Sequence, residues 1–366
     1  MTSTTFQSTE LPRSAYELPK TVRFSSLAVV LVFFAIFPLL FTNPTVSSVG
    51  VWAMVFVMCV SGWNIFSGYT GYIALGHAVF YGVGQYATAL LMLHMNITPG
   101  WPSFILIPIS GVIAAIFAIP IGWMLLRVRK HTFIVLTIAM MFIFQLLAYN
   151  WSSITQGSTG LQPAQPLWAG DTFNNPFYYV AFAGAILAIL TSWIVRRSKF
   201  GLNLLAIRDD EDRARSLGIN TARSKLIAFV ISAVFLGFAG SVYALFVGQV
   251  FPQFAFDPSF DVSLTVMAFA GGIGTIAGPA IGALVVSSAQ QYFYITYGGQ
   301  NVFLIVYGIL FIALLRLLPG GVVPAIAGRW RNFVSSRSNV RDPHHDEPPP
   351  TADVAHVATG AEGGSN

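Results

Sequence analysis

The chain has 366 residues, of which 55 % are hydrophobic and only 9 % are Asp, Glu, Lys or Arg, and its formal net charge is +5. A soluble domain carries about 25 % charged residues, so this composition and a mean hydropathy of +0.68 exclude an ordinary soluble protein. Uncharged runs at 25–41 and 133–149 approach the roughly 20 residues that a membrane-spanning helix needs. The strict alternation of a membrane β-barrel is absent. We therefore expect an all-α, polytopic membrane protein.

Residues 1–23 form a polar tail that leads directly into the first apolar stretch, with no convincing small-residue cleavage site after it. We expect that stretch to be a retained helix rather than a signal peptide. The permease domain is expected over 24–325, and the Pro-, Gly- and charge-rich tail over 326–366 should be disordered. Ten apolar stretches follow in chain order, at residues 24–42, 49–67, 73–94, 103–126, 131–150, 177–195, 226–249, 259–276, 280–297 and 301–318.

The positions of the basic residues predict the orientation. If the N-terminus is inside and each stretch crosses once, all 19 Lys and Arg fall in the tails, in inside loops or at inside ends of spans. None falls in the outside segments, which are 43–48, 95–102, 151–176, 250–258 and 298–300. Basic residues are retained on the cytoplasmic side. We therefore expect about ten crossings with both termini cytoplasmic, and this arrangement argues against nucleic-acid binding as the reason for the positive charge.

Glycine interrupts the eighth stretch, within 268–283. Gly271, Gly272 and Gly274 are followed by Gly278 and Pro279, and both residue types weaken a helix interior. A short or broken helix is expected here. Non-helical backbone at membrane depth is tolerated where it is buried in protein or lines a cavity, and interrupted segments of transporters often face the substrate route. The alternative is that these glycines only let neighbouring helices approach closely.

A second glycine-rich segment, 67–91, contains Gly71, Gly76 and one titratable residue, His77. We expect these glycines to interrupt the helix here as well. His77 either satisfies a local hydrogen bond in the protein interior or lines the pathway together with these glycines. Cys59, the only cysteine, lies within an apolar run, cannot form an internal disulfide and is expected to be a packing residue.

No energy source is evident within the chain. None of the 14 Asp and Glu residues lies in the middle of a predicted span, and Asp261 is at the outer end of one. Proton-coupled carriers typically relay protons through intramembrane Asp, Glu or His, so self-contained ion coupling is not expected. The phosphate-binding pattern GxxxxGK[ST] is absent. The chain is predicted to be a transport subunit and not an enzyme, driven by another polypeptide. No cofactor and no metal site are expected; His344 and His345 lie in the polar tail.

The inside loop 196–225 concentrates the charge. From Arg208 to Arg215, seven of eight residues are charged, so this segment must be outside the membrane. Leu202, Leu204, Leu205 and Ile207 predict an apolar helical turn. The acidic cluster Asp209–Asp212 suits the first turn of a second short helix, which Gly218 would end after Leu217. Such a helix could dock into a groove on a soluble partner; the alternative is a solvated loop. The predicted docking residues are Arg208, Asp209, Asp210, Glu211, Asp212, Arg213, Ala214, Arg215 and Gly218.

The segment "FGLNLLAIRDDEDRARSLGINTARSKLIAFVISAVFLGFAGSVYA" (200–244) resembles the LivM-type permeases of ABC importers for branched-chain amino acids. The resemblance continues in 68–91, in "GGIGTIAGPAIGA" (271–283) and in "YGILFIALLRLLPGGV" (307–322), and covers about residues 25–325. Of the EAA-x-x-x-G pattern that coupling loops of such importers often carry, only Ala214 and Gly218 match strictly, and the downstream Leu-Pro is absent. This departure leaves the exact contact residues of the loop open.

The resemblance implies a multi-pass permease of the bacterial inner membrane. It implies a second permease subunit of LivH type, two ATP-binding subunits, a periplasmic or lipid-anchored solute-binding protein, and membrane lipid as partners. The expected function is ATP-driven import of a small polar solute, a branched-chain amino acid in the first instance. Permeases of the same family carry urea, short amides or aromatic acids, and more distant ones carry sugars. The alternatives from other classes are a self-sufficient secondary carrier or flippase and a non-transporting scaffold.

Overall fold

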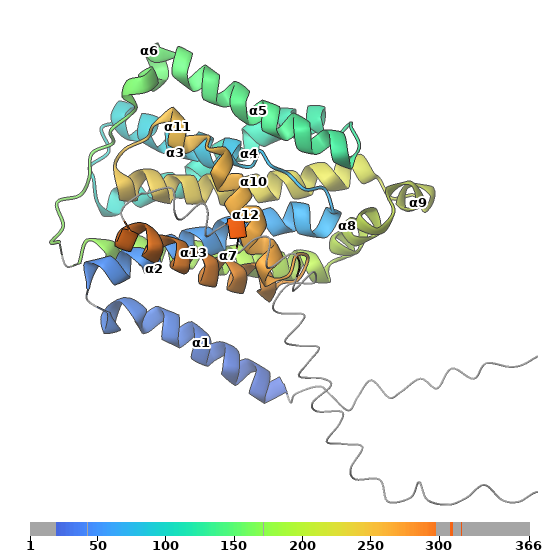
Figure 1. Ribbon diagram of the computed structural model, residues 1–366, viewed down its shortest axis with the longest axis horizontal. Helices are drawn as coiled ribbons and strands as arrows, with labels where there is room; N and C mark the ends of the chain where they lie inside the picture. The colour runs from blue at the N-terminus through green and yellow to red at the C-terminus, as the bar shows by residue number, and fades with distance from the viewer. Residues whose placement is uncertain (1–19, 42, 171, 298–307, 310–315, 317–366) are drawn as a thin grey trace, which may run out of the picture. The chain divides into compact units, whose positions relative to one another are not determined.

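A computed structural model describes residues 20–41, 43–170, 172–297, 308, 309 and 316. This part of the chain is helical and has no strand beyond one isolated bridge between Leu161 and Val250. Residues 1–19, the tail 326–366 and nearly all of the tenth apolar stretch, 301–318, lie outside the described residues. The α-helices (Figure 1) are α1 (Lys20–Leu40), α2 (Pro44–Trp63), α3 (Ala78–His94), α4 (Leu106–Leu125), α5 (Lys130–Asn150), α6 (Ser152–Thr155), α7 (Asn174–Arg197), α8 (Lys199–Asp209), α9 (Glu211–Ser216), α10 (Thr221–Val247), α11 (Pro252–Ala255), α12 (Pro258–Gly271) and α13 (Ala277–Tyr297).

Five helical segments of the described part are long and apolar enough to cross a membrane. They are Pro44–Gly68, Trp101–Leu125, Lys130–Asn150, Asn174–Arg197 and Thr221–Val247. Together with the helical architecture they confirm the predicted class, a helical multi-pass membrane protein. The described helices α3 and α12 have only 17 and 14 residues, so the number of crossings, expected to be about ten, remains a prediction.

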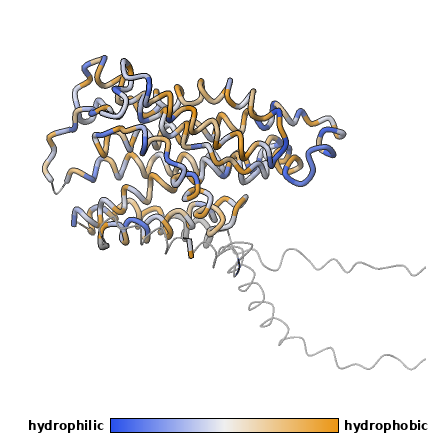
Figure 2. The backbone as a smooth tube through the Cα atoms, turned by 45° about the horizontal axis from the view of Figure 1, so that its top comes forward, coloured by the Kyte–Doolittle hydropathy of each residue, from blue (hydrophilic) through white to orange (hydrophobic). Residues whose placement is uncertain are grey.

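The spans differ in how deeply they are buried. In the most apolar part of the α2 and α10 spans, 83 % and 61 % of residues are buried, compared with 22–39 % for the spans containing α4, α5 and α7. Apolar side chains such as Ile116 of α4 and Val135 of α5 are exposed. This pattern places α2 and α10 at the centre and gives the other three spans lipid-facing surfaces. Figure 2 shows hydrophobic backbone along the long helices and a hydrophilic end at α8 and α9.

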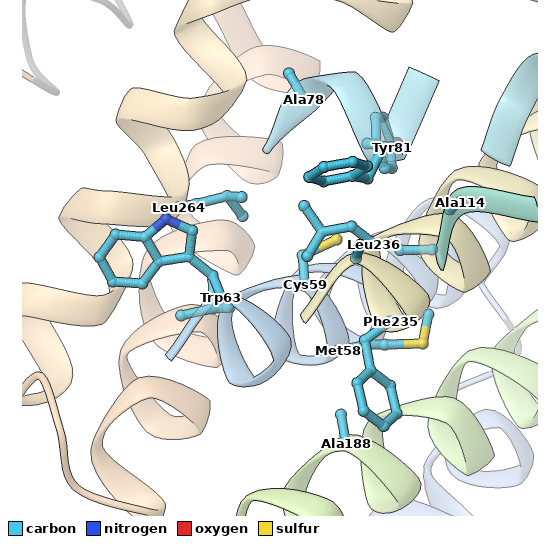
Figure 3. Packing of buried hydrophobic residues seen from close by; sticks show 14 of the residues in the cluster. Met58, Cys59, Trp63, Ala78, Tyr81, Ala114, Ala188, Phe235, Leu236 and Leu264 are labelled. Carbon is cyan, nitrogen blue, oxygen red and sulfur yellow. The ribbon is translucent and has the colours of Figure 1, made fainter. Parts of the chain in front are cut away.

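The core is built around α2, which packs against α7, α10, α12 and α13. Figure 3 shows side chains of this core, among them Ala188 of α7, Leu236 of α10 and Leu264 of α12. Cys59 and Trp63 of α2 are fully buried, as are Leu236 and Leu264. Cys59 is a free, buried thiol, in agreement with its predicted packing role. Small residues bring the backbones together: a Cβ at Gly84 of α3 would overlap the main-chain oxygen of Gly237 of α10, the kind of contact that glycine permits between membrane helices.

The glycine-rich segment 67–91 interrupts the helices between α2 and α3. After Trp63 the helix continues as a π-helix, η1 (Asn64–Gly68), and the backbone from residue 71 to 77 is not helical before α3 begins at Ala78. The buried carboxylate of Asp261 completes this helix start, because both of its oxygens accept from the Ala78 amide at 3.2 Å. Asp261 lies in the first turn of α12, so the start of α12 caps the start of α3.

The second interruption separates α12 from α13. Helix α12 ends at Gly271, the backbone leaves the helical region at Gly272, and α13 begins at Ala277. Thr275 caps the start of α13, since its hydroxyl accepts from the Gly278 amide at 3.0 Å. The short helix predicted for the eighth apolar stretch is therefore present.

Candidate functional site: the charged segment between α7 and α10

Helix α8 begins immediately after α7. The Ser198 hydroxyl accepts from the Gly201 amide at 3.1 Å, which is the usual cap of a helix start. Leu204 and Ile207 are fully buried, as expected for the apolar turn. Leu202, predicted to belong to the same apolar group, is 62 % exposed. The buried stripe of α8 is therefore narrower than the sequence suggested, and an apolar side chain is left on its outer face.

Helix α9 is a separate short helix capped by Asp210. Its Oδ1 accepts from the amides of Asp212 and Arg213, both at 3.0 Å. These bonds lower the pKa of Asp210 below its ordinary value, and the bond from the Arg213 amide has the largest effect. At the other end Gly218 adopts φ +83°, and the Ile219 amide donates to the Ala214 carbonyl at 3.1 Å. The predicted second helix, with its acidic start and glycine stop, is confirmed.

The underside of α9 is joined to the spans by a buried cluster. Glu211 Oε1 lies 2.7 Å from Lys225 Nζ of α10, and Tyr72 donates its hydroxyl to Glu211 Oε2. Lys225 also donates to the Tyr72 hydroxyl at 3.1 Å and to the Leu126 carbonyl at 3.4 Å. Burial by itself would raise the pKa of Glu211, but the bonds from Lys225 and Tyr72 outweigh it and hold that pKa below the ordinary value.

The outer side of the segment is charged and open. The side chains of Asp212, Arg213 and Arg215 are largely exposed to solvent. Asp209 is exposed as well, and Leu217 is 81 % exposed. An open groove of about 420 Å³ runs between α8 and α9, lined by Ala206, Asp209, Asp210, Arg213, Ala214 and Leu217. The segment thus presents mixed charge around an apolar side chain.

The turn between α4 and α5 supports the same segment. Lys130 Nζ donates to the Arg208 carbonyl at 3.0 Å, which satisfies one of the free carbonyls at the end of α8. Arg129 lies 4.0 Å from Asp212, with both side chains largely exposed. An exposed pair of this kind adds little stability. The partly buried contacts of Glu211 and Lys130 therefore hold the segment in place.

The predicted pathway residues lie in closely packed positions. A Cβ at Gly76 would overlap the Thr137 carbonyl, and a Cβ at Gly271 would overlap the Gly278 oxygen. His77 is fully buried, and its Nε2 lies 2.5 Å from the hydroxyl of Ser232 on α10. The two glycines thus show close packing between backbones, and His77 makes a local hydrogen bond. Both features were expected as alternatives to a role in lining the pathway.

Two of the predicted pathway glycines lie beside one predicted docking residue. A Cβ at Gly71 would be 3.0 Å from Arg208 Cγ, and a Cβ at Gly274 would overlap Arg208 Nη1. The structure therefore brings together the two interruptions and the end of α8, which sequence reasoning treated as separate features. It also adds Tyr72 and Lys225, which that reasoning missed. The available signal was Lys225, which stands immediately before the uncharged stretch 226–249.

Residues 45–315 match the family described as "Branched-chain amino acid transport system / permease component". The chain belongs to this family. This permease chain is 29 % identical over 293 residues to the high-affinity branched-chain amino acid transport system permease protein LivM of Escherichia coli K12, covering 72 % of the chain and 67 % of the relative. It is 30 % identical to LivM of Salmonella typhimurium LT2, covering 69 % and 66 %.

A second kind of relative matches as well. LivH of Escherichia coli K12, named as a permease of the same transport system, is 26 % identical over 256 residues, which cover 64 % of the chain and 80 % of the relative. The chain spans about two thirds of the length of the LivM proteins that it matches. No solved structure matches.

Proposed function

We propose that the chain is the permease subunit of an ATP-driven importer in the bacterial inner membrane and forms half of the pore. Its partners are a second permease of LivH type, two ATP-binding subunits, and a periplasmic or lipid-anchored solute-binding protein. The single observation that carries this proposal is the α8–α9 segment. This segment is a capped and charged surface element, and the Glu211–Lys225 ion pair joins it to the central span α10. A transporter that performs its own energy conversion has no need of such a docking element.

The docking element comprises the predicted residues Asp209–Arg215 together with Gly218. Arg208, which was also predicted to dock, contacts the spans instead, because its Nη1 donates to the Gly68 carbonyl at 2.9 Å. The exposed members of the element, Asp209, Asp212, Arg213 and Arg215, are available to a partner. Its inner members attach the element to the spans. Glu211 does so by its ion pair with Lys225, and Ala214 does so by packing, since Ala214 is 1 % exposed. A short helix of this kind, inserted into a groove of one ATP-binding subunit, would transmit movement because its base is fixed.

The transported solute is proposed to be a branched-chain amino acid, supported by family membership and by the names of the LivM and LivH relatives. Urea or a short amide is the alternative within the same family. The solute-binding protein is proposed to make most of the selection. Gly71, Gly76, His77, Gly271, Gly272 and Gly274 are retained as proposed pathway residues because they belong to the two interruptions of membrane helices, where non-helical backbone commonly lines a route.

The decisive experiment is reconstitution. The permease is co-expressed with the ATP-binding subunits, second permease and solute-binding protein encoded beside it, purified by a tag on the permease and assayed in vesicles. Co-purification of the ATPase and ATP-dependent uptake of leucine, isoleucine or valine are expected. Uptake by the permease alone, driven by a proton or sodium gradient, would contradict the proposal and favour a secondary carrier. Exchanging the solute-binding protein should change the solute more than His77→Ala does.

A further inference from the structure

Arg208, in the last turn of α8, reaches back into the membrane-spanning part. Its Nη1 donates to the Gly68 carbonyl at 2.9 Å, while its own carbonyl is held by Lys130. Among the described residues, the ion pairs are formed by Arg129, Arg213, Arg215 and Lys225, and no carboxylate lies within 4.0 Å of the Arg208 side-chain nitrogens. This cation is therefore stabilised by something other than a salt bridge.

The groups around the guanidinium belong to the C-terminal ends of two interrupted helices. Gly68 is the last residue of the π-helix that continues α2. Gly274 follows the end of α12 at Gly271 by three residues, and its Cα is so close that an added Cβ would overlap Nη1. The C-terminal end of a helix carries roughly half a negative charge, because its last carbonyls lack an intrahelical donor. The Gly68 carbonyl, at one such end, accepts directly from the guanidinium, and Gly274, in the turn after the other end, lies beside it.

The two interruptions are also bonded to each other. The buried side chain of Asn64, in the π-helix, accepts from the Gly274 amide at 2.8 Å and donates to the Thr275 carbonyl at 2.9 Å. Gly71 lies beside the arginine stem: a Cβ added to it would be 3.0 Å from Arg208 Cγ. The end of η1 and the turn between α12 and α13 thus form one hydrogen-bonded unit, and Arg208 contacts both parts of it.

We propose that Arg208 is the positioning residue through which movement of α8 and α9 reaches both interrupted helices at the same time. It stands two residues before Asp210, the cap of α9, so a displacement of α9 moves the guanidinium directly. The planar guanidinium can donate several hydrogen bonds in a fixed geometry, whereas lysine offers a compact point charge. The proposal rests on the proposed function for the source of the movement, but the contact itself can be tested without it.

The first test uses the full-length permease alone in native membrane vesicles. In a Cys59→Ser background, a single cysteine replaces half-buried Ile73 or Ile276, one in each interruption, and its rate of maleimide labelling is measured. Arg208→Gln should raise the rate at both positions about three- to tenfold, the local opening expected from loss of one hydrogen bond. Arg208→Lys should give a smaller increase, since it keeps the charge. The control Arg223→Gln, which removes an exposed cation of the same loop, should change neither rate.

The second test uses the assembled transporter. Arg208→Gln should recover the ATP-binding subunits in normal amounts, because Arg208 faces the spans, yet transport much less solute per ATP hydrolysed. Arg208→Lys should restore part of that ratio. Labelling of residue 73 and residue 276 should change together on ATP binding in the unmodified protein, and neither should change in Arg208→Gln.

Three results would overturn the proposal: an increase in labelling at only one position or at neither, normal coupling in Arg208→Gln, or loss of the ATP-binding subunits in that variant. The last result would place Arg208 on the docking face. If the unmodified permease itself recovered no ATPase, the proposed function would fail, and the labelling of the permease alone would still decide the role of Arg208.

Discussion

Glu211 and Lys225 form an ion pair that joins the first residue of α9 to the first turns of α10. The Lys225 ammonium lies 2.7 Å from Glu211 Oε1, and the lysine side chain is 3 % exposed. Lys225 is further held by the Tyr72 hydroxyl at 3.1 Å and lies over the Tyr72 ring. A buried lysine is tolerated only when its charge is paired and its donors are used. The docking element is therefore attached to a central span by a contact that is costly to break.

Breaking this pair from one side should loosen α9. Lys225→Met leaves the Glu211 carboxylate without its cation, which should lower the free energy of unfolding by about 3 kcal/mol, the low end for buried pairs because Glu211 retains some solvent contact. Thermal unfolding of the detergent-solubilised permease gives the measurement. The double variant Lys225→Met with Glu211→Gln should recover part of the loss. Equal stability of the single and double variants would show that the unpaired Glu211 carboxylate is not the cause of the loss.

Acidification should release the same contact. Because the pKa of Glu211 is lowered from 4.5 on folding, the carboxylate contributes stability above pH 4.5 and loses it as the pH falls through the folded value. Amide-exchange protection of α9 should therefore decrease as the pH falls below 4.5. Glu211→Gln should remove most of this dependence. A variant with the same pH profile as the unmodified chain would assign the dependence to another carboxylate.

Gly218 offers a substitution whose effect comes from the backbone alone. Its φ is +83°, and an added Cβ would meet nothing within 4 Å. Gly218→Val should destabilise the end of α9 by about 1–2 kcal/mol, whereas Gly218→Asn should cost much less because asparagine adopts this conformation more readily. ATPase recovered per permease should fall in the first variant and stay near normal in the second. Equal recovery in both would mean that the glycine stop does not position the docking surface.

The acidic cluster should separate into two classes of variant. Asp209→Lys and Asp212→Lys alter only exposed charge, so they should weaken ATPase recovery in a salt-dependent way and leave the melting temperature unchanged. Asp210→Lys removes the cap of α9 and should lower recovery at every salt concentration. Glu211→Lys places a second cation beside Lys225 and should reduce accumulation of the permease. If all four variants recovered ATPase normally, the docking role would be wrong.

The orientation can be tested with an impermeant thiol reagent applied to intact cells. In the Cys59→Ser background, a cysteine at the exposed Leu167 should react, and a cysteine at the exposed Leu217 should react only after the membrane is opened. The two positions are matched in residue type and both are highly exposed, so accessibility alone does not separate them. The reverse pattern would place residues 206–216 outside.

The local features of the coupling segment could be predicted because they follow from short-range rules. An aspartate before a charged turn and a glycine after it define α9 within nine residues, and both were found where the sequence indicated. The attachment of that helix could not be predicted in the same way. Tyr72 and Glu211 are 139 residues apart, and no pattern in either neighbourhood specifies that their side chains meet.

The helix interruptions illustrate the same division. Glycine and proline indicated where α12 would end, since their backbone preferences are local. Whether the freed backbone faces a route or a neighbouring helix depends on tertiary packing, and the bonds from Asn64 to residues 274 and 275 span more than 200 positions. Asp261 lies in the first turn of α12, and the sequence did not reveal that its carboxylate caps another helix.

The cap that Asp261 provides for Ala78 has a consequence for how the protein is made. The two residues are separated by 183 positions, so α3 leaves the ribosome long before its cap exists. At a synthesis rate of 5–20 residues per second, the start of α3 waits roughly 10–40 s for α12. During that interval the amides at the N-terminus of α3 lack their carboxylate partner. The start of α3 therefore reaches its final structure only after α12 has been made.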